Sequence, residues 1–212
     1  DSDTVAITVA GINDAPVVSN LEGDSLNYNE GAGAVVIEQG GNAAVSDIDS
    51  ADFNTGTLTI SFVAGSDSAE DVLGIRNQGT GAGQIGVAGA NVTYAGTTIG
   101  TWAGGSGGSN LVITLNANAN STNAAALIQN ITYQNTDTVA PTAGSRTVRF
   151  ALTDGDGGAS ANYDTTVTVS GVNDPPSIID ATVALDENSA NATAVTNVSD
   201  SFTGTDLDRD GE

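Results

Sequence analysis

The chain alternates apolar and polar residues over many short stretches, and a period of two is typical of half-buried β-strands. Runs rich in Gly, Asn and Asp separate these stretches and predict hairpin turns. Many short strands at such spacing predict an all-β fold, an antiparallel β-sandwich. The expected strands are Val35–Glu38, Thr57–Phe62, Gln84–Val87, Asn91–Tyr94, Thr97–Trp102, Leu111–Leu115, Thr147–Thr153 and Tyr163–Ser170.

One segment departs from the alternation. Residues Asn123–Asn130 are rich in helix-forming residues and follow a candidate N-cap at Thr122 or Asn123. The sequence therefore predicts one short helix, which would cross from one sheet to the other.

Two nearly identical phrases, Gly11–Pro16 and Gly171–Pro176, lie one domain-length apart. Each follows an alternating run, and the prolines within it stiffen the chain by fixing φ. We interpret the phrases as joints in a tandem array, and the chain as an excised fragment of a longer protein. Residues 1–14 would be the last strand of a preceding repeat, 15–174 a complete repeat, and 175–212 the start of the next.

The composition narrows the classes of partner. The chain has 26 Asp and Glu but only four Arg and Lys, and its formal net charge is −22. Such a charge excludes nucleic acid and anionic membrane surfaces, which need basic side chains. No apolar run is long enough to insert into a membrane. Because like charges oppose a compact state, bound divalent cations are the natural counterbalance.

The absence of Cys, His and Met removes several kinds of chemistry. Disulfides, the usual zinc and copper sites and Cys/His nucleophile pairs are all excluded. Oxygen ligands remain, and the acidic residues are mostly Asp. An extracellular protein of this composition needs another source of stability, and calcium is the leading candidate.

A second acidic signature follows each joint at nearly the same distance. Asp47-Ile48-Asp49 comes after the first joint, and Asp206-Leu207-Asp208 comes after the second. Two carboxylates separated by one residue in a turn can both face a calcium ion, which binds about six to eight oxygens. A single Asp usually just starts a turn, but the repeated arrangement favours metal ligation.

These motifs resemble those of cadherin repeats, in particular the bacterial cadherin-like repeats of giant RTX-type adhesins. The resemblance covers essentially all of residues 15–174, and the phrases Asn130–Tyr133 and Leu152–Gly158 within it look like those of the bacterial repeats. It implies a Greek-key, cadherin- and immunoglobulin-like β-sandwich. It also implies an ion cluster at each joint. The N-terminal cluster would comprise Asn13, Asp14, Asp47, Asp49 and Asp154. The C-terminal cluster would comprise Glu30, Asn173, Asp174, Asp206 and Asp208.

The chain departs from the animal cadherin pattern in two places. Glycines, Gly11 and Gly171, stand near the position of the first linker Asp, and the acidic-Arg-acidic motif has no match except a poor substitute at Asp137. We therefore expect one or two ions at each joint rather than three.

The favoured hypothesis is a calcium-rigidified spacer repeat of a secreted adhesin at the bacterial cell surface. Its cofactor would be Ca²⁺, and its partners would be neighbouring repeats of the same chain, with cell-surface or matrix ligands in addition. An apo repeat would bend more easily and be more sensitive to proteases.

Other readings of the sequence are weaker. Catalysis is not expected, because the acidic pairs lie at the joints and a chain without His, Lys or Cys offers few catalytic groups.

A carbohydrate-binding module is the main alternative. Its best anchor is Trp102, beside the Gly104–Gly108 loop, although a lone Trp is more often a core residue. Homotypic adhesion is a third reading, but no exposed apolar anchor near a terminus supports it. Gly81–Gly86 fits a dinucleotide motif by letter, but no helical pattern follows it.

Overall fold

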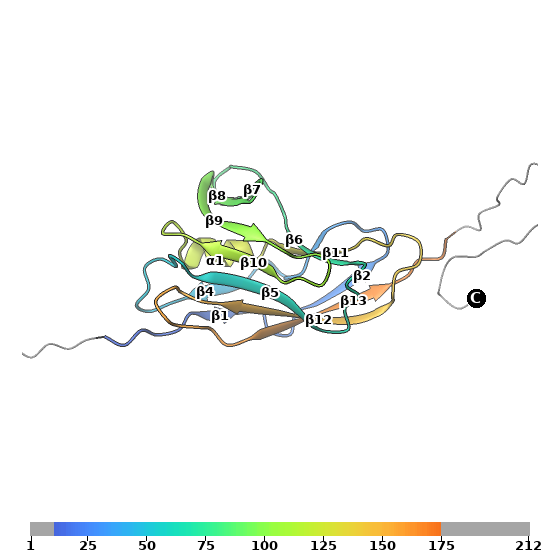
Figure 1. Ribbon diagram of the computed structural model, residues 1–212, viewed down its shortest axis with the longest axis horizontal. Coiled ribbons are helices and arrows are strands. Elements are labelled where there is room, and N and C mark those ends of the chain that lie inside the picture. The colour runs from blue at the N-terminus through green and yellow to red at the C-terminus, as the bar shows by residue number, and fades with distance from the viewer. Residues whose placement is uncertain (1–10, 175–212) are drawn as a thin grey trace, which may run out of the picture.

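The computed structural model describes residues 11–174, and within this range most of the ordered structure is β-strand, with one short helix (Figure 1). The strands form three sheets. The largest contains, in spatial order, β2 (Ser25–Asn29), β13 (Tyr163–Ser170), β12 (Gly144–Leu152), β5 (Thr57–Ala64), β10 (Leu111–Leu115), β9 (Thr97–Ala103), β8 (Asn91–Tyr94) and β7 (Ile85–Ala88). The second contains β3 (Val35–Val36), β11 (Ile131–Asn135) and β6 (Asp71–Ile75). The third contains β1 (Val17–Ser19) and β4 (Ala44–Ser46).

The core lies between the two larger sheets. Tyr133 of β11 meets Tyr28 of β2 edge to face, with ring centroids 4.9 Å apart, and Phe62 of β5 at 6.1 Å. Alternation decides which residues enter this core: in β13, Val167 and Val169 are buried, whereas the threonines on either side of Val167 are more exposed. The apolar area removed from water supplies the main favourable term in folding.

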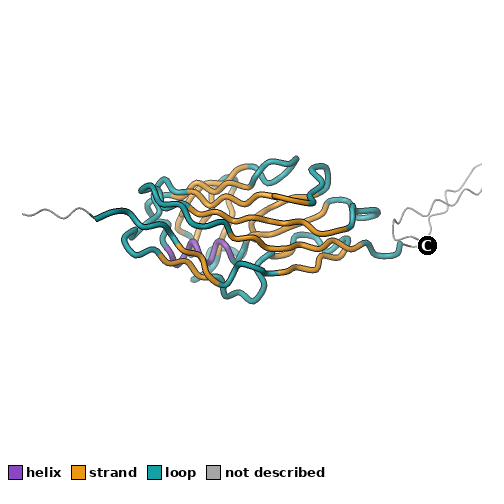
Figure 2. The backbone as a smooth tube through the Cα atoms, turned by 90° about the horizontal axis from the view of Figure 1, so that it is seen from below, coloured by secondary structure: helices purple, strands orange, loops and turns teal. Residues whose placement is uncertain are grey.

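One strand pair differs from the expected antiparallel arrangement. β13 pairs with β2 in parallel, with Val167 opposite Leu26, whereas every other strand pair in residues 11–174 is antiparallel. Parallel neighbours need a long connection, and here most of the domain lies between the two strands. Because β2 and β13 run the same way, the described chain begins at one end of the long axis and finishes at the other (Figures 1 and 2).

The helix, α1 (Ser121–Ile128), lies between β10 of the large sheet and β11 of the second sheet, so the predicted crossing is confirmed. Its predicted N-cap is wrong. Oδ1 of Asn120 accepts from the backbone N–H groups of Thr122 and Asn123, and Oδ1 of Asn123 accepts from the Asn120 N–H. This reciprocal capping box places the helix start before Asn123. At eight residues, α1 is too short to span a membrane, and no other helix in residues 11–174 could do so.

The eight predicted strands all have an observed counterpart, three of them with identical bounds. Five strands that alternation did not predict are also present: β1, β2, β4, β6 and β11. β1 and β4 have three residues each, too few for a period of two to be visible. β6 begins with a buried carboxylate, Asp71, which breaks the apolar pattern.

Candidate functional site

Pairing of β1 with β4 brings the N-terminal joint beside the first D-x-D motif. Val17 lies opposite Ser46, so the residues just before β1, Asn13 and Asp14, reach the turn that follows β4. β12 runs to the same end of the domain, and Asp154 lies just after its last residue. The five residues predicted for the N-terminal cluster therefore come from three segments that meet at one end of the fold.

Two sets of hydrogen bonds tie the joint to the domain. Nδ2 of Asn13 donates to Oδ2 of Asp154 at 2.8 Å. The backbone N–H of Asp14 donates to both carboxylate oxygens of Asp49, at 3.2 and 3.1 Å. The linker is therefore held by two of the acidic side chains that the sequence singled out.

Asp154 is fully buried, and its carboxylate accepts several hydrogen bonds. Oδ1 accepts the backbone N–H groups of Asp156 at 2.8 Å and Gly158 at 2.9 Å. Burial raises the pKa of this carboxyl, but the hydrogen bonds from Asn13 and from the loop N–H groups outweigh burial, so the net pKa is lowered. Asp154 is therefore held as an anion at neutral pH.

Gly158 leaves room for three polar groups to converge. A Cβ at this position would overlap Oδ2 of Asp154, and would lie 2.7 Å from the carbonyl oxygen of Asp14 and 2.8 Å from Nδ2 of Asn13. Rotation of the Asn13 amide would present its Oδ1 in place of the nitrogen. The site can thus offer carboxylate, carbonyl and amide oxygens around one point.

Asp47 forms the turn after β4. Its Oδ1 accepts the backbone N–H groups of Asp49 at 3.3 Å and Ser50 at 3.1 Å. Its Oδ2 is buried and has no hydrogen-bond partner, and the same is true of the hydroxyl of Ser50. A buried carboxylate oxygen without a partner is costly, so a bound cation would stabilise Asp47.

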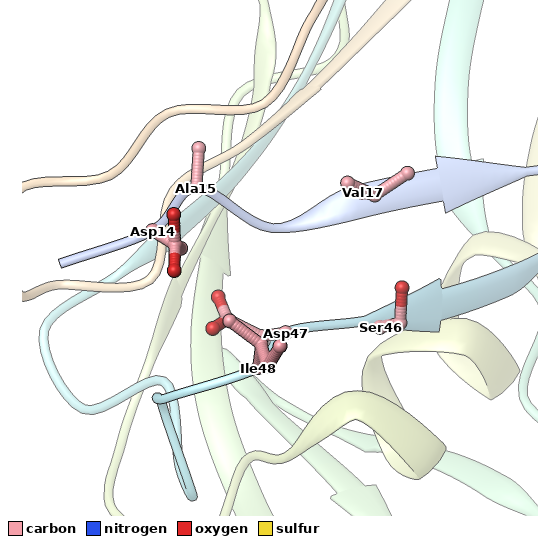
Figure 3. A pocket seen from close by; sticks show the side chains of 6 residues that line it. All are labelled: Asp14, Ala15, Val17, Ser46, Asp47 and Ile48. Atoms are coloured by element: carbon pink, nitrogen blue, oxygen red, sulfur yellow. The ribbon is translucent and has the colours of Figure 1, made fainter.

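An open pocket of about 540 Å³ lies beside Asp47 and Asp14. Figure 3 shows the two carboxylates across from each other, with Asp14 on the segment before β1 and Asp47 directly after β4. Val17 and Ile48 add apolar surface to its lining, and Ile48 is 86% exposed.

The C-terminal end repeats part of this arrangement. Glu30 follows β2, and Oε2 of its side chain accepts the backbone N–H of Val172 at 2.9 Å, just after β13. Its Oε1 is buried and has no hydrogen-bond partner. Parallel pairing of β2 and β13 places Glu30 at this end, because Ser170 lies opposite Asn29.

The other predicted C-terminal residues are not brought together with Glu30. Asn173 makes a contact of 3.5 Å with the Asp174 carbonyl, and no hydrogen bond joins either residue to Glu30 in the described part of the chain. Asp206 and Asp208 lie outside the described residues.

The carboxylates are spread rather than clustered. Within residues 11–174, no three of them lie close enough together to hold a metal ion by themselves. Calcium also accepts carbonyl, amide and water oxygens, and at the N-terminal end such donors stand beside Asp154 and Asp47. These donors fit a hard cation and would suit a soft metal poorly.

Three contributors were not predicted from the sequence. They are Gly158, which leaves space beside Asp154, Ser50, whose hydroxyl is unpartnered, and Val172, whose backbone N–H binds Glu30. In the sequence, only the pair of glycines after Asp156 pointed to a role for Gly158. Asp137, the poor substitute for the missing cadherin motif, accepts the N–H groups of Val139 and Ala140 in the loop after β11.

Comparison of the chain with known protein families, with curated proteins and with solved structures finds no match in any of the three.

Proposed function

We propose that this chain is a calcium-binding extender repeat of a secreted or cell-surface adhesin, with a cadherin-like Greek-key β-sandwich and ions at its inter-repeat joints. Calcium would hold adjacent repeats in line and stiffen the array. The repeat itself would act as a spacer rather than as an enzyme.

The observation that carries this proposal is the placement of the unpartnered oxygens. In residues 11–174, the buried side-chain oxygens and nitrogens without a hydrogen-bond partner are Oε1 of Glu30, Oδ2 of Asp47 and Oγ of Ser50. Asp47 and Ser50 lie at one joint and Glu30 at the other. Buried polar groups are normally satisfied, so their restriction to the joints supports a cation at each end.

The charge of the chain supports the same proposal. With a net charge of −22, bringing a second repeat against either joint would add further carboxylates to an acidic surface. A divalent cation held at the N-terminal joint by fewer than three carboxylates, together with neutral oxygens, would supply the positive charge that the chain lacks. The Asp14 carbonyl and the Asn13 amide are the neutral oxygen donors beside it.

Exposed apolar side chains at the joints fit a neighbouring repeat as the partner. Ile12 is 88% exposed and Ile48 is 86% exposed, and both belong to the N-terminal joint. Val172, 48% exposed, lies at the other end. Contact with the adjacent repeat would cover these side chains, and the ions would prevent the two acidic surfaces from repelling each other.

The position of the joints at opposite ends of the long axis (Figure 2) suits a linear array. A rod of stacked repeats reaches further than a flexible string of the same number of residues. Because a stiff rod reaches further, a calcium-bound array would hold the rest of an adhesin away from the bacterial surface.

Calcium titration of the full chain tests the proposal. We expect saturable binding by calorimetry, with dissociation constants in the ~10⁻⁴–10⁻³ M range typical of extracellular modules. The midpoint of thermal unfolding should rise, and two repeats joined in tandem should become longer in small-angle scattering. Magnesium is the matched control, because it prefers a smaller octahedral site. An apo form as stable and as rigid as the calcium form would refute the proposal.

A further inference from the structure

A pocket of about 310 Å³ lies away from both joints, between the outer face of the second sheet and the β9 end of the large sheet. The backbone N–H of Leu73 in β6 donates to the carbonyl of Gly105 at 2.7 Å, which joins the two sheets beside the pocket. This volume is at the lower end of the range for small-molecule sites and suits one sugar unit better than a large ligand.

The lining has no charged side chain. Val72, Ile75 and the ring of Trp102 supply apolar surface, while Ser106, Thr132 and Gln134 supply neutral polar groups. On a chain with a net charge of −22, an uncharged pocket with hydroxyl and amide groups disfavours anionic ligands and offers hydrogen bonds to a neutral one.

Trp102 is fixed in place rather than mobile. Its indole Nε1 donates to the carbonyl of Gly89 at 3.1 Å, and the side chain is half-buried and packs against the core. A rigid aromatic ring at the side of a pocket offers a face on which the C–H groups of a pyranose can pack. The ring therefore serves the core and the pocket together.

Thr132 is the observation that points to a ligand. The residue is only 4% exposed and lines the pocket. Its hydroxyl has no hydrogen bond to a described residue and is not among the fully buried unpartnered atoms, so it is open to the pocket. Gly74 lies opposite Thr132 in the β6–β11 pair, and a Cβ there would lie 3.0 Å from the Thr132 hydroxyl. The missing side chain at Gly74 thus leaves space directly beside an unpaired hydroxyl.

Taken together, the geometry points to a binding site for one neutral pyranose unit of a polysaccharide or glycan. The sugar ring would pack on Trp102, and its hydroxyls would exchange hydrogen bonds with Thr132, Gln134 and Ser106. This site is separate from the joints and would give the repeat a ligand of its own.

The fluorescence of Trp102 provides a direct test, because it is the one Trp of the chain. The full chain is titrated with the methyl glycosides of glucose, galactose, mannose and N-acetylglucosamine, and a glycan array identifies longer ligands. We expect a saturable change for at least one neutral glycoside. A single sugar of about a dozen heavy atoms binds with an affinity on the order of 1 mM. The result should be the same with calcium or with chelator, since no carboxylate lines the pocket.

Two variants separate binding from folding. Thr132→Val keeps the shape of the side chain but removes the unpaired hydroxyl, so the thermal midpoint should hold or rise while sugar affinity falls about three- to tenfold. Gly74→Ala narrows the pocket from the opposite strand and should weaken binding further. Thr101→Ala, an exposed neighbour of Trp102, is the control and should bind as the unchanged chain does.

Several results would overturn the inference. One is the absence of a saturable signal with every neutral glycoside well above ~10 mM together with an empty array. Another is equal binding by the unchanged chain, Thr132→Val and Gly74→Ala. Preference for a glucuronide over a neutral glycoside would contradict the charge argument. Self-association that sugar does not affect but Gly74→Ala abolishes would assign the pocket to a second copy instead.

Discussion

Nε of Arg146 donates a hydrogen bond to Oδ2 of Asp71 at 3.1 Å, and neither side chain is more than 1% exposed. The same carboxylate accepts the Tyr133 hydroxyl, the Asn135 amide at 3.1 Å and the Asp67 backbone N–H at 2.7 Å. Burial, and next the hydrogen bond and negative charge of Asp71, raise the pKa of Tyr133, which stays a neutral donor. A charged network thus links β6, β11 and β12 across the two layers.

Arg146→Met should destabilise the fold by about 3–5 kcal/mol, because it leaves the Asp71 carboxylate buried without its counter-ion. Chemical denaturation measures the loss. The double variant with Asp71→Asn should lose less than the sum of the two single changes, since it no longer buries an unpaired charge.

Arg149→Ala provides the matched control. Arg149 pairs with Asp164 at 2.7 Å, but the two side chains are 36% and 32% exposed, so the removal of Arg149 should destabilise the fold far less than Arg146→Met does. Equal losses for Arg146→Met and Arg149→Ala would show that the buried network does not contribute as we argue.

Asp47→Asn should weaken calcium binding at the N-terminal joint by ~tenfold or more, since it removes one ligand charge and the unpartnered oxygen. Calorimetry should then show one class of sites weakened and the C-terminal class retained. Asp52→Asn is the control, because Asp52 accepts the Asn54 N–H in a nearby turn. If both variants behave alike, Asp47 has no special role.

Gly158→Ala should disturb the N-terminal joint, because its Cβ would overlap Oδ2 of Asp154. We expect a loss of about 1–3 kcal/mol without calcium and a smaller rise in the unfolding midpoint on adding calcium. Gly171→Ala is the control at the opposite joint, where the new Cβ would approach only Oε2 of Glu30, at 3.7 Å. An unchanged calcium response in Gly158→Ala would show that this convergence of oxygens is not the binding site.

Asp154 should make the calcium-free fold sensitive to acid. Its pKa in the folded state is lowered from an unfolded value of about 3.9. The ionised carboxylate therefore stabilises the fold above about pH 4, and this contribution is lost as the pH falls through the lowered folded pKa. Asp154→Asn should be less stable at neutral pH, and the difference should shrink in acid. Denaturation in chelator from neutral pH into acid measures this, and a pH-independent difference would contradict it.

Filling a joint with calcium should stabilise the fold by about 1–3 kcal/mol when free calcium is about 10 to 100 times the dissociation constant. Differential scanning calorimetry at several calcium concentrations gives this dependence. A midpoint that does not change with calcium, although calorimetry detects binding, would mean that the ion binds folded and unfolded chains equally.

The Asn13–Asp154 contact illustrates how far the sequence could predict the candidate site. Both residues were predicted from the resemblance to cadherin-repeat motifs, and they lie 141 residues apart in the chain. The unpaired state of Asp47 Oδ2 was not predictable, because it depends on which neighbouring N–H groups the turn presents. Trp102 was named from the sequence as the best anchor for a carbohydrate, but the pocket beside it was not predictable, since it requires β6, β9 and β11 to meet.

The sequence by itself determined the predominance of β-structure, the eight strands with clear alternation, the presence of one helix and the candidate acidic residues. The strands and the helix depend on local periodicity, turn residues and helix-forming residues, whereas the acidic residues were predicted from two repeated motifs and from the resemblance to cadherin repeats. Tertiary structure decided the parallel β2–β13 pair, the buried Asp71–Arg146 network and the unpartnered oxygens of Glu30 and Asp47. Each of these depends on contacts between residues distant in the chain, where burial and packing set the energy of a polar group.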